Sequence, residues 1–357
     1  MHTRRLLLQG GVVSAAALAF GSAFALAQVP GQLAAPEAQP HPAETSFGDR
    51  MSGDLTGTHD PCIIKQGDTY YVFGSDQLGK EGEHHCPWRT SKDLLHWEAR
   101  GNLFDHLPPW AEEAVPGTKA MWAPDISVIG GRYHLYYALS TFGSNRSAIG
   151  LYTNATLDPA DKAYAWKDEG LVFASQRSDD YNCIDPAQFQ DREGNHWLVF
   201  GSFWGGIKMI RLDAKTGKPH PGDRQVHDLI RRPAPVGAPD AVEAPFMIER
   251  DGWYYLFASY DYCCKGVASS YYMVVGRSKS VTGPYVGRDG KPMTEGFGTL
   301  ELRGDMHWRG PGHEAVLREK DRDYLVYHTY DAAHQGASTL RISPIVWTPD
   351  GWPTVKL

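Results

Sequence analysis

The chain has 357 residues, of which 42% are hydrophobic and 22% charged, a balance typical of a soluble globular protein with one large domain or two. The formal net charge is −7 and no run of Lys or Arg exceeds a pair, which argues against nucleic acid as a partner because phosphate binding needs a clustered basic face. The 38 glycines, 18 tyrosines and 11 tryptophans favour many short strands joined by tight turns.

Residues 1–28 are predicted to be an export signal. Arg4 and Arg5 precede three leucines, an apolar run follows from Gly10 to Ala19, and residues 23–27 offer A-x-A cleavage sites. The paired arginines resemble the twin-arginine type of signal, so we expect export to the periplasm or the medium. The alternative is an uncleaved membrane anchor. Because the apolar run is short for a spanning helix, we expect no stable membrane span once the signal is removed.

Residues 29–46 are predicted to be a linker, since four prolines lie there among Ala, Gln and Glu. The rest of the chain, residues 47–357, is predicted to form a single folded domain, and we expect the protein to be a monomer.

Five similar stretches follow one another along this domain. Each begins with an acidic or imidazole side chain, which we call the lead residue, and ends 15 to 17 residues later at a polar residue that closes an aromatic strand. The lead residues are Asp60, Asp125, Asp185, Glu243 and His313, and the closing residues are Ser75, Ser140, Ser202, Ser259 and His328. The lead residues are 65, 60, 58 and 70 positions apart, a period typical of propellers and repeat arrays.

Each stretch has the pattern of a β-hairpin. A proline next to the lead residue favours the start of a strand, and a polar turn such as Gly130-Gly131 or Asp251-Gly252 separates two apolar runs. With a further strand pair per unit, the sequence predicts an all-β fold, a five-bladed β-propeller, in which the lead residues occupy equivalent places and converge on one axis. A two-sheet jelly roll is the alternative, but it gives no reason for one ionisable residue to recur in five successive hairpins.

The chain has five cysteines, an odd number whose spacings fit no zinc pattern. Cys263 and Cys264 are adjacent, and the sequence leaves open whether they form a disulfide or remain two free thiols.

Several carboxylates converging on one axis would repel one another and lose hydration unless they had a chemical task. Hydrolysis of a glycosidic bond needs such a set. One carboxylic acid protonates the departing oxygen, and one carboxylate attacks the sugar or activates water.

Five short motifs together resemble glycoside hydrolase family 43, whose members are five-bladed propellers. They are HDP at 59–61, WAPD at 122–125, IDP at 184–186, EAP at 243–245 and GPGH at 310–313. Segments 140–151, 201–207 and 261–266 are similar to those of its endo-acting α-1,5-L-arabinanases. The resemblance implies an enzyme that hydrolyses arabinan, a side chain of plant cell-wall pectin.

The resemblance also implies a role for each central residue. Asp60 matches the general base, Glu243 the general acid, and Asp185 the carboxylate that adjusts the pKa and position of the acid. The implied mechanism inverts the anomeric centre, for which the two carboxyl groups are roughly 6.5 to 9.5 Å apart. His313 matches a histidine that helps to hold a metal ion through waters, often calcium. No proton-transfer role falls on Asp125, for which we expect a structural or substrate-orienting part.

Trp122 and Phe142 match aromatic residues of the arabinan groove, where a ring can stack on a furanose, and Trp204 is a third candidate. The family also contains exo-acting α-L-arabinofuranosidases and β-xylosidases, and these stay open as alternatives, as does a sugar-binding propeller without catalysis. The invertase and levansucrase group is disfavoured because its NDPNG, RDP and EC motifs are replaced here by residues such as Ile184 and Ala244.

Overall fold

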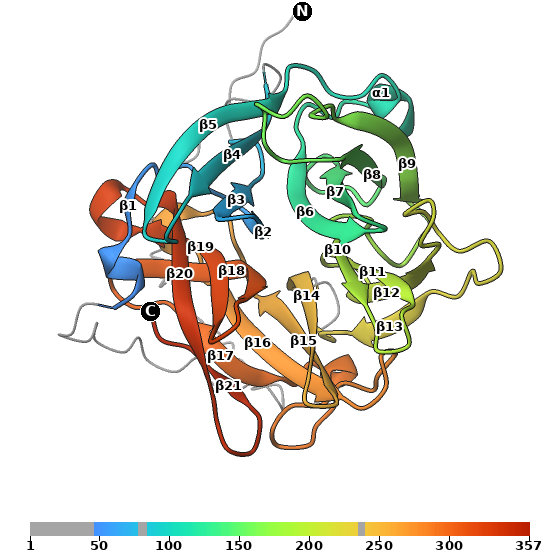
Figure 1. Ribbon diagram of the computed structural model, residues 1–357. Coiled ribbons are helices and arrows are strands. Elements are labelled where there is room, and N and C mark those ends of the chain that lie inside the picture. The colour runs from blue at the N-terminus through green and yellow to red at the C-terminus, as the bar shows by residue number, and fades with distance from the viewer. Residues whose placement is uncertain (1–45, 78–83, 235–239) are drawn as a thin grey trace, which may run out of the picture. The chain divides into compact units, whose positions relative to one another are not determined.

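The computed structural model describes residues 46–77, 84–234 and 240–357. The predicted signal and all of the predicted linker except Ser46 lie outside these residues, so both remain predictions. In the described chain, five sheets follow one another in chain order around a common centre, as the colours of Figure 1 show. The predicted five-bladed β-propeller is confirmed, and the jelly-roll alternative is wrong.

Each sheet is a blade whose strands pair in sequence order. Blade 1 contains β2 (Cys62–Gln66), β3 (Thr69–Phe73), β4 (His85–Ser91) and β5 (His96–Phe104), with the short β1 (Ser52–Gly53) parallel to β5. Blade 2 contains β6 (Trp122–Ile129), β7 (Arg132–Leu139), β8 (Ser147–Asn154) and β9 (Lys167–Ser175). Blade 3 contains β10 (Ala187–Gln190), β11 (His196–Phe200), β12 (Ile207–Leu212) and β13 (His227–Ile230).

Blade 4 contains β14 (Val242–Arg250), β15 (Trp253–Tyr260), β16 (Tyr272–Ser278) and β17 (Thr299–Arg303). Blade 5 contains β18 (Trp308–Arg318), β19 (Asp323–Asp331), β20 (Ala337–Trp347) and β21 (Pro353–Thr354). Helical turns are short: α1 (Ala111–Ala114), η1 (Gly48–Arg50), η2 (Gly266–Ala268), η3 (Met293–Glu295) and η4 (Ala332–His334). In the residues that the structure describes, no helix is long and apolar enough to cross a membrane.

The innermost hairpins have the turns that the sequence predicts. Ile129 pairs with Arg132 across Gly130-Gly131, and Arg250 pairs with Trp253 across Asp251-Gly252. All four turn residues have positive φ, as a two-residue turn that follows the right-handed twist of its strands requires.

Apolar side chains fill the space between neighbouring blades, not the centre of the ring. Each of the five apolar clusters joins two consecutive blades, and the buried leucines of their strands include Leu135, Leu198, Leu256, Leu325 and Leu340. Because the core is divided in this way, polar side chains at the inner strand starts remain free to face a central cavity.

The segment before β2 joins blade 5 to blade 1. The Leu340 N–H donates to the Leu55 carbonyl at 3.0 Å, and the Gly57 N–H donates to the Ser338 carbonyl at 2.7 Å. These bonds hold the first blade against the last, and they place Asp60 close to residues of β18 and β19.

Candidate active site

One backbone feature recurs where each innermost strand begins, in β2, β6, β10, β14 and β18 or just before them. A residue with φ between 40° and 56° lies two positions before the first regular pair of the hairpin, where it turns the chain toward the centre. These residues are Asp60, Ala123, Asp185, Ala244 and His313. The predicted equivalence of the lead residues is therefore right for Asp60, Asp185 and His313. It is wrong for Glu243, one residue earlier in its blade, and for Asp125, two residues later.

Backbone N–H groups at four of these turns connect a blade to the one before it. The Ala123 N–H donates to Ser75 Oγ at 2.7 Å, and the Ala244 N–H donates to Asp185 Oδ2 at 3.0 Å. Two further bonds run from the Asp60 N–H to His328 Nδ1 at 3.1 Å and from the His313 N–H to Ser259 Oγ at 2.9 Å. Three of the predicted closing residues thus fix the blades relative to one another at the centre.

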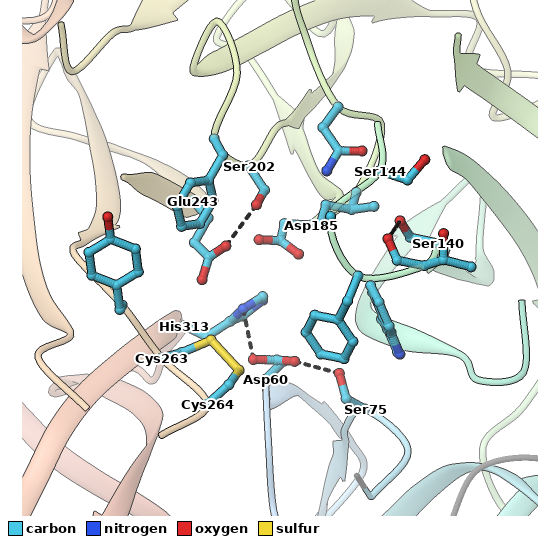
Figure 2. Close-up of a pocket in the computed structure, with 18 of the residues that line it drawn as sticks. Asp60, Ser75, Ser140, Ser144, Asp185, Ser202, Glu243, Cys263, Cys264 and His313 are labelled. Atoms are coloured by element: carbon cyan, nitrogen blue, oxygen red, sulfur yellow. Dashed lines mark hydrogen bonds and ion pairs between the residues drawn. A yellow bond between two sulfur atoms is a disulfide. The ribbon is translucent and has the colours of Figure 1, made fainter. Parts of the chain in front are cut away.

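A cavity of about 720 Å³ opens at this centre. Its lining includes all seven predicted site residues, Asp60, Trp122, Phe142, Asp185, Trp204, Glu243 and His313. Figure 2 shows the three carboxyl groups and the His313 imidazole directed into the same space. Asp125 is absent from the lining. It is buried and accepts the Gln188 N–H at 2.8 Å, which agrees with the structural part expected for it.

The aromatic side chains form an exposed rim of the cavity. Phe142 is 70% exposed and Trp204 is 38% exposed, although both are large and apolar. The Trp122 and Phe142 rings lie 4.9 Å apart between centroids. Exposed rings beside a polar cavity are typical of sugar-binding surfaces, because a ring can pack against the C–H face of a pyranose or furanose.

Asp60 is surrounded by donors. His313 Nδ1 lies 3.0 Å from Oδ1, His59 Nδ1 lies 2.8 Å from Oδ2, and the Ser75 hydroxyl donates to Oδ2. Burial alone would raise the pKa of Asp60, but the charges and hydrogen bonds of His59 and His313 hold it well below its ordinary value. Asp60 is therefore an ionised carboxylate at neutral pH.

A closed chain of hydrogen bonds supports Asp60. Its N–H donates to His328 Nδ1, so the neutral His328 ring carries its proton on Nε2, which lies 3.3 Å from the Tyr330 oxygen. The Tyr330 oxygen also lies 2.8 Å from His59 Nε2, and His59 Nδ1 lies 2.8 Å from the Asp60 carboxylate, which closes the chain. Burial lowers the pKa of His328 well below its ordinary value, in agreement with this neutral tautomer.

Glu243 has a different environment from Asp60. The Tyr271 hydroxyl donates to Oε1 and the Ser202 hydroxyl to Oε2, each at 2.7 Å. Burial raises the pKa of Glu243, and the negative charge of Asp60 raises it further, against the lowering effect of both hydroxyls and of His313. Glu243 therefore retains a proton at a pH at which Asp60 is ionised.

Asp185 lines the same cavity as Glu243. Burial raises the pKa of Asp185, and the negative charges of Glu243 and Asp60 add to this effect, while His313 opposes it. When two interacting carboxyl groups both resist ionisation, the pKa values seen in a titration describe the pair and not either residue alone.

His313 provides the positive charge of the site. Burial opposes its protonation, but Asp60 and Asp185 raise the pKa of His313 to about 9. Among the described residues, two clusters bring three His, Cys, Asp or Glu ligand atoms close enough for one ion: His59, Cys263 and Cys264, and His59, Asp60 and His328. Neither includes His313, and Asp60 is the one residue of the two clusters that offers an oxygen ligand, whereas calcium takes several. These residues do not fit a calcium ion bound directly by the protein, and a water-held ion stays a prediction.

Five residues around the cavity were not predicted as site residues from the sequence: His59, Tyr271, Tyr330, Cys263 and Cys264. The structure forms a disulfide between these cysteines, which decides the alternative left open above, and both line the cavity. His59 stands in the HDP motif and could have been found there. Tyr271 and Tyr330 reach the site only through the fold.

Comparisons with known proteins agree on one family. Residues 55–353 match the model described as glycosyl hydrolases family 43. The chain is 41% identical over 314 residues to an extracellular endo-α-(1→5)-L-arabinanase of Bacillus subtilis, covering 88% of this chain and 91% of that protein. It is 38% identical over 305 residues to an extracellular exo-α-(1→5)-L-arabinofuranosidase of Cellvibrio japonicus, covering 83% and 86%.

Solved structures give the same result. A family 43 endo-arabinanase from Bacillus licheniformis is 44% identical with a TM-score of 0.77, covering 85% of this chain and 99% of that chain. The α-L-arabinanase of Cellvibrio cellulosa, solved in complex with arabinohexaose, is 37% identical with a TM-score of 0.79, covering 85% and 96%.

Proposed function

Because the chain belongs to family 43 of the glycosyl hydrolases and is a glycoside hydrolase, we propose that it cleaves α-1,5-L-arabinofuranosidic bonds in arabinan with Asp60 as general base and Glu243 as general acid. One observation carries this proposal. Two carboxyl groups line the same cavity, and their surroundings move their pKa values in opposite directions, down for Asp60 and up for Glu243. Such a divergence distinguishes the base from the acid in a pair of carboxyl groups.

The proposed reaction uses this divergence. The ionised Asp60 takes a proton from a water molecule as that water attacks the anomeric carbon, and the protonated Glu243 gives its proton to the departing glycosidic oxygen. Because a water molecule and not the protein attacks the sugar, the anomeric configuration inverts. We assign Asp185 to positioning and to keeping Glu243 protonated. NMR of the first product formed tests the inversion directly.

The substrate follows from the relatives. The Bacillus subtilis relative is named an arabinanase, and the Cellvibrio cellulosa structure contains arabinohexaose. We propose arabinan of plant cell walls as the polysaccharide, with Trp122, Phe142 and Trp204 as the surface on which its sugars pack.

We propose endo action, since the relative with 41% identity is an endo-arabinanase. The 38% identical exo-acting relative makes release of one short product the second candidate. On debranched arabinan, an endo enzyme releases mixed oligosaccharides early and lowers viscosity fast. A single short product from the first minutes would assign the enzyme to the exo class, and activity on xylan fragments alone would reject arabinan.

Export is part of the proposal, because three of the curated relatives are named extracellular. The twin-arginine route and the monomeric state stay predictions. Export of the wild type but not of an Arg4→Lys/Arg5→Lys variant, read by fractionation of the expressing cells, checks the first. Size-exclusion chromatography with light scattering checks the second.

Replacement of the two carboxyl groups tests the catalytic assignment. Asp60→Asn and Glu243→Gln should each lower kcat by at least about a hundredfold, the scale of general acid–base catalysis. Glu314→Gln is the matched control, because Glu314 is a buried carboxyl next to His313 that does not line the cavity. Near-normal turnover of arabinan by the Glu243→Gln protein would contradict the assignment of Glu243 as general acid.

A further inference from the structure

The Cys263–Cys264 disulfide lies at the wall of the active-site cavity. Both residues line the cavity and are half-buried, so their sulfur atoms are accessible to a molecule bound there. In Figure 2 the disulfide lies on the Asp60 side of the cavity, across from Ser140 and Ser144. The catalytic reaction proposed above gives no task to this group.

The disulfide segment is held on both sides. Asp261 forms an ion pair with Arg232, and the Tyr262 carbonyl accepts the N–H groups of Ser270 and Tyr271 at 3.0 and 3.2 Å. After the disulfide, the Lys265 N–H donates to Ser269 Oγ at 3.0 Å. A bond between adjacent cysteines also closes a small covalent ring, which restricts the backbone between them. The two sulfur atoms are therefore fixed before any ligand arrives.

The same segment contacts the hydrogen-bonded chain around Asp60. The Cys264 N–H donates to the Tyr330 hydroxyl oxygen at 2.7 Å, and Cys264 Sγ lies 3.8 Å from His59 Nε2. His59 thus contacts both Cys264 Sγ and the Asp60 carboxylate, which activates water in the proposed reaction. Asp60, Cys263 and Cys264 line the same cavity.

The chemistry of this group favours contact over coordination. His59 and the two cysteines have ligand atoms within 4.8 Å of one another, but sulfur binds metal ions as thiolate and not as disulfide. A disulfide is instead a polarisable apolar group without a hydrogen-bond donor, suited to pack against C–H groups. Trp122 and Phe142 give the cavity a second apolar wall, from blade 2.

We propose that the Cys263–Cys264 disulfide is a substrate-contacting group of this enzyme, with its two sulfur atoms forming a fixed apolar surface for the C–H face of an arabinofuranose next to Asp60. The inference rests on the proposed function. Because the surface is rigid in the free enzyme, binding costs little conformational entropy there. Reduction to two thiols frees both side chains and removes the surface without changing any carboxyl group.

The first test is a thiol count on the denatured protein. Without reductant the protein should show three thiols, those of Cys62, Cys86 and Cys183, and after reduction it should show five. A phosphine reductant serves here, since it is oxidised to its oxide with water as oxygen source while the disulfide gains two electrons and two protons. Five thiols in the unreduced protein would overturn the proposal.

Affinity is the decisive test. In the Glu243→Gln background, calorimetry with a linear arabino-oligosaccharide should show about tenfold weaker binding for the phosphine-reduced protein and for Cys263→Ser/Cys264→Ser, the scale of one lost apolar contact. With Glu243 present, KM should rise by a similar factor while kcat stays within about twofold. The reductant should not change the affinity of the double variant, whose remaining cysteines are already thiols.

The outcomes separate this inference from the proposed function. Equal affinity of the oxidised and reduced proteins overturns the contact role while arabinan binding stands, and the reduced wild-type chain gives this answer even where the double variant does not fold. No binding of the oligosaccharide by the oxidised protein overturns the proposed substrate, and the contact role with it.

Discussion

The Tyr271 ring occupies the space that a side chain at position 312 would fill, and this residue is a glycine. A Cβ atom added at Gly312 would lie 2.0 Å from Tyr271 Cδ1, closer than any real contact. Gly312 directly precedes His313, and the Tyr271 hydroxyl donates to Glu243 at 2.7 Å. The missing side chain in blade 5 thus lets a tyrosine bond the proposed acid in blade 4.

Removal of the Tyr271 hydroxyl should therefore change the pKa of Glu243. The hydrogen bond stabilises the ionised carboxylate, so its loss in Tyr271→Phe should raise the pKa of Glu243 and move the basic limb of the kcat/KM profile to higher pH. The rate should fall roughly tenfold, the scale of one hydrogen bond to a charged group. Gly312→Ala should act in the same direction by displacing the ring. Tyr272→Phe is the control, because the hydroxyl oxygen of this neighbouring tyrosine accepts from Arg232 and does not bond Glu243. An unmoved limb in Tyr271→Phe would contradict the assignment.

Replacement of Asp185 should move the basic limb of the kcat/KM profile in the opposite direction. As a carboxyl neighbour of Glu243, it favours the protonated acid, so Asp185→Asn should lower the rate and move the basic limb to lower pH. Asp125→Asn is matched to this variant, since Asp125 is also buried and also accepts a backbone N–H of the next blade, but lies outside the cavity lining. Identical profile shapes for Asp185→Asn and the wild type would leave Asp185 a purely geometric role.

The repeat made the propeller predictable because every blade needs the same local chemistry. A proline, a polar turn and an aromatic return strand recur wherever the structure has an inner hairpin, and turns such as Gly130-Gly131 follow from backbone requirements alone. The exact register was not predictable in the same way. Spacing alone does not show that the turn residue of blade 4 is Ala244, with Glu243 one position earlier.

The network around the carboxyl groups was not predictable for a further reason. Tyr330 is 271 residues from the His59 that it bonds, and Tyr271 is 28 residues from Glu243. Neither tyrosine has a local signal, because aromatic residues fill every inner strand of this chain. Such partners become visible only when the blades are closed into a ring.

A buried carboxyl pair outside the cavity should make stability depend on pH. Burial, with the nearby charge of Glu314, raises the pKa of Glu301 to about 8, and burial raises the pKa of Glu314 to about 7. The folded state therefore binds these protons more tightly than the unfolded chain. Their contribution to stability is complete below the unfolded pKa of about 4.5 and is lost as pH rises through about 7 to 8.

Glu301→Gln should remove the loss of stability at high pH that the buried Glu301 carboxyl causes. Its melting temperature should exceed that of the wild type by a few degrees at pH 9 and should differ little at pH 5. Glu295→Gln, which changes an exposed glutamate, should have no such effect. A Glu301→Gln protein that is destabilised equally at both pH values would show that the carboxyl is held by a partner and not strained by burial.

The predicted calcium ion can be tested against the charge of His313. With its pKa raised to about 9 by Asp60 and Asp185, His313 is protonated at neutral pH and repels a cation, so proton and calcium compete for the centre of the cavity. If a water-held ion binds there, prolonged chelation should lower both the melting temperature and the activity, and added calcium should restore both.

The size and pH dependence of the effect identify the site. An ion bound only by the native state stabilises it by about 2.7 kcal/mol at a hundredfold excess over its Kd. The shift should be larger at pH 9 than at pH 6, because a larger fraction of His313 is unprotonated at pH 9. His313→Ala should respond weakly to calcium, whereas His134→Gln, which changes a buried histidine outside the cavity lining, should respond as the wild type does. A dialysed protein that contains no metal and is indifferent to chelator would show that no ion binds at the centre of the cavity.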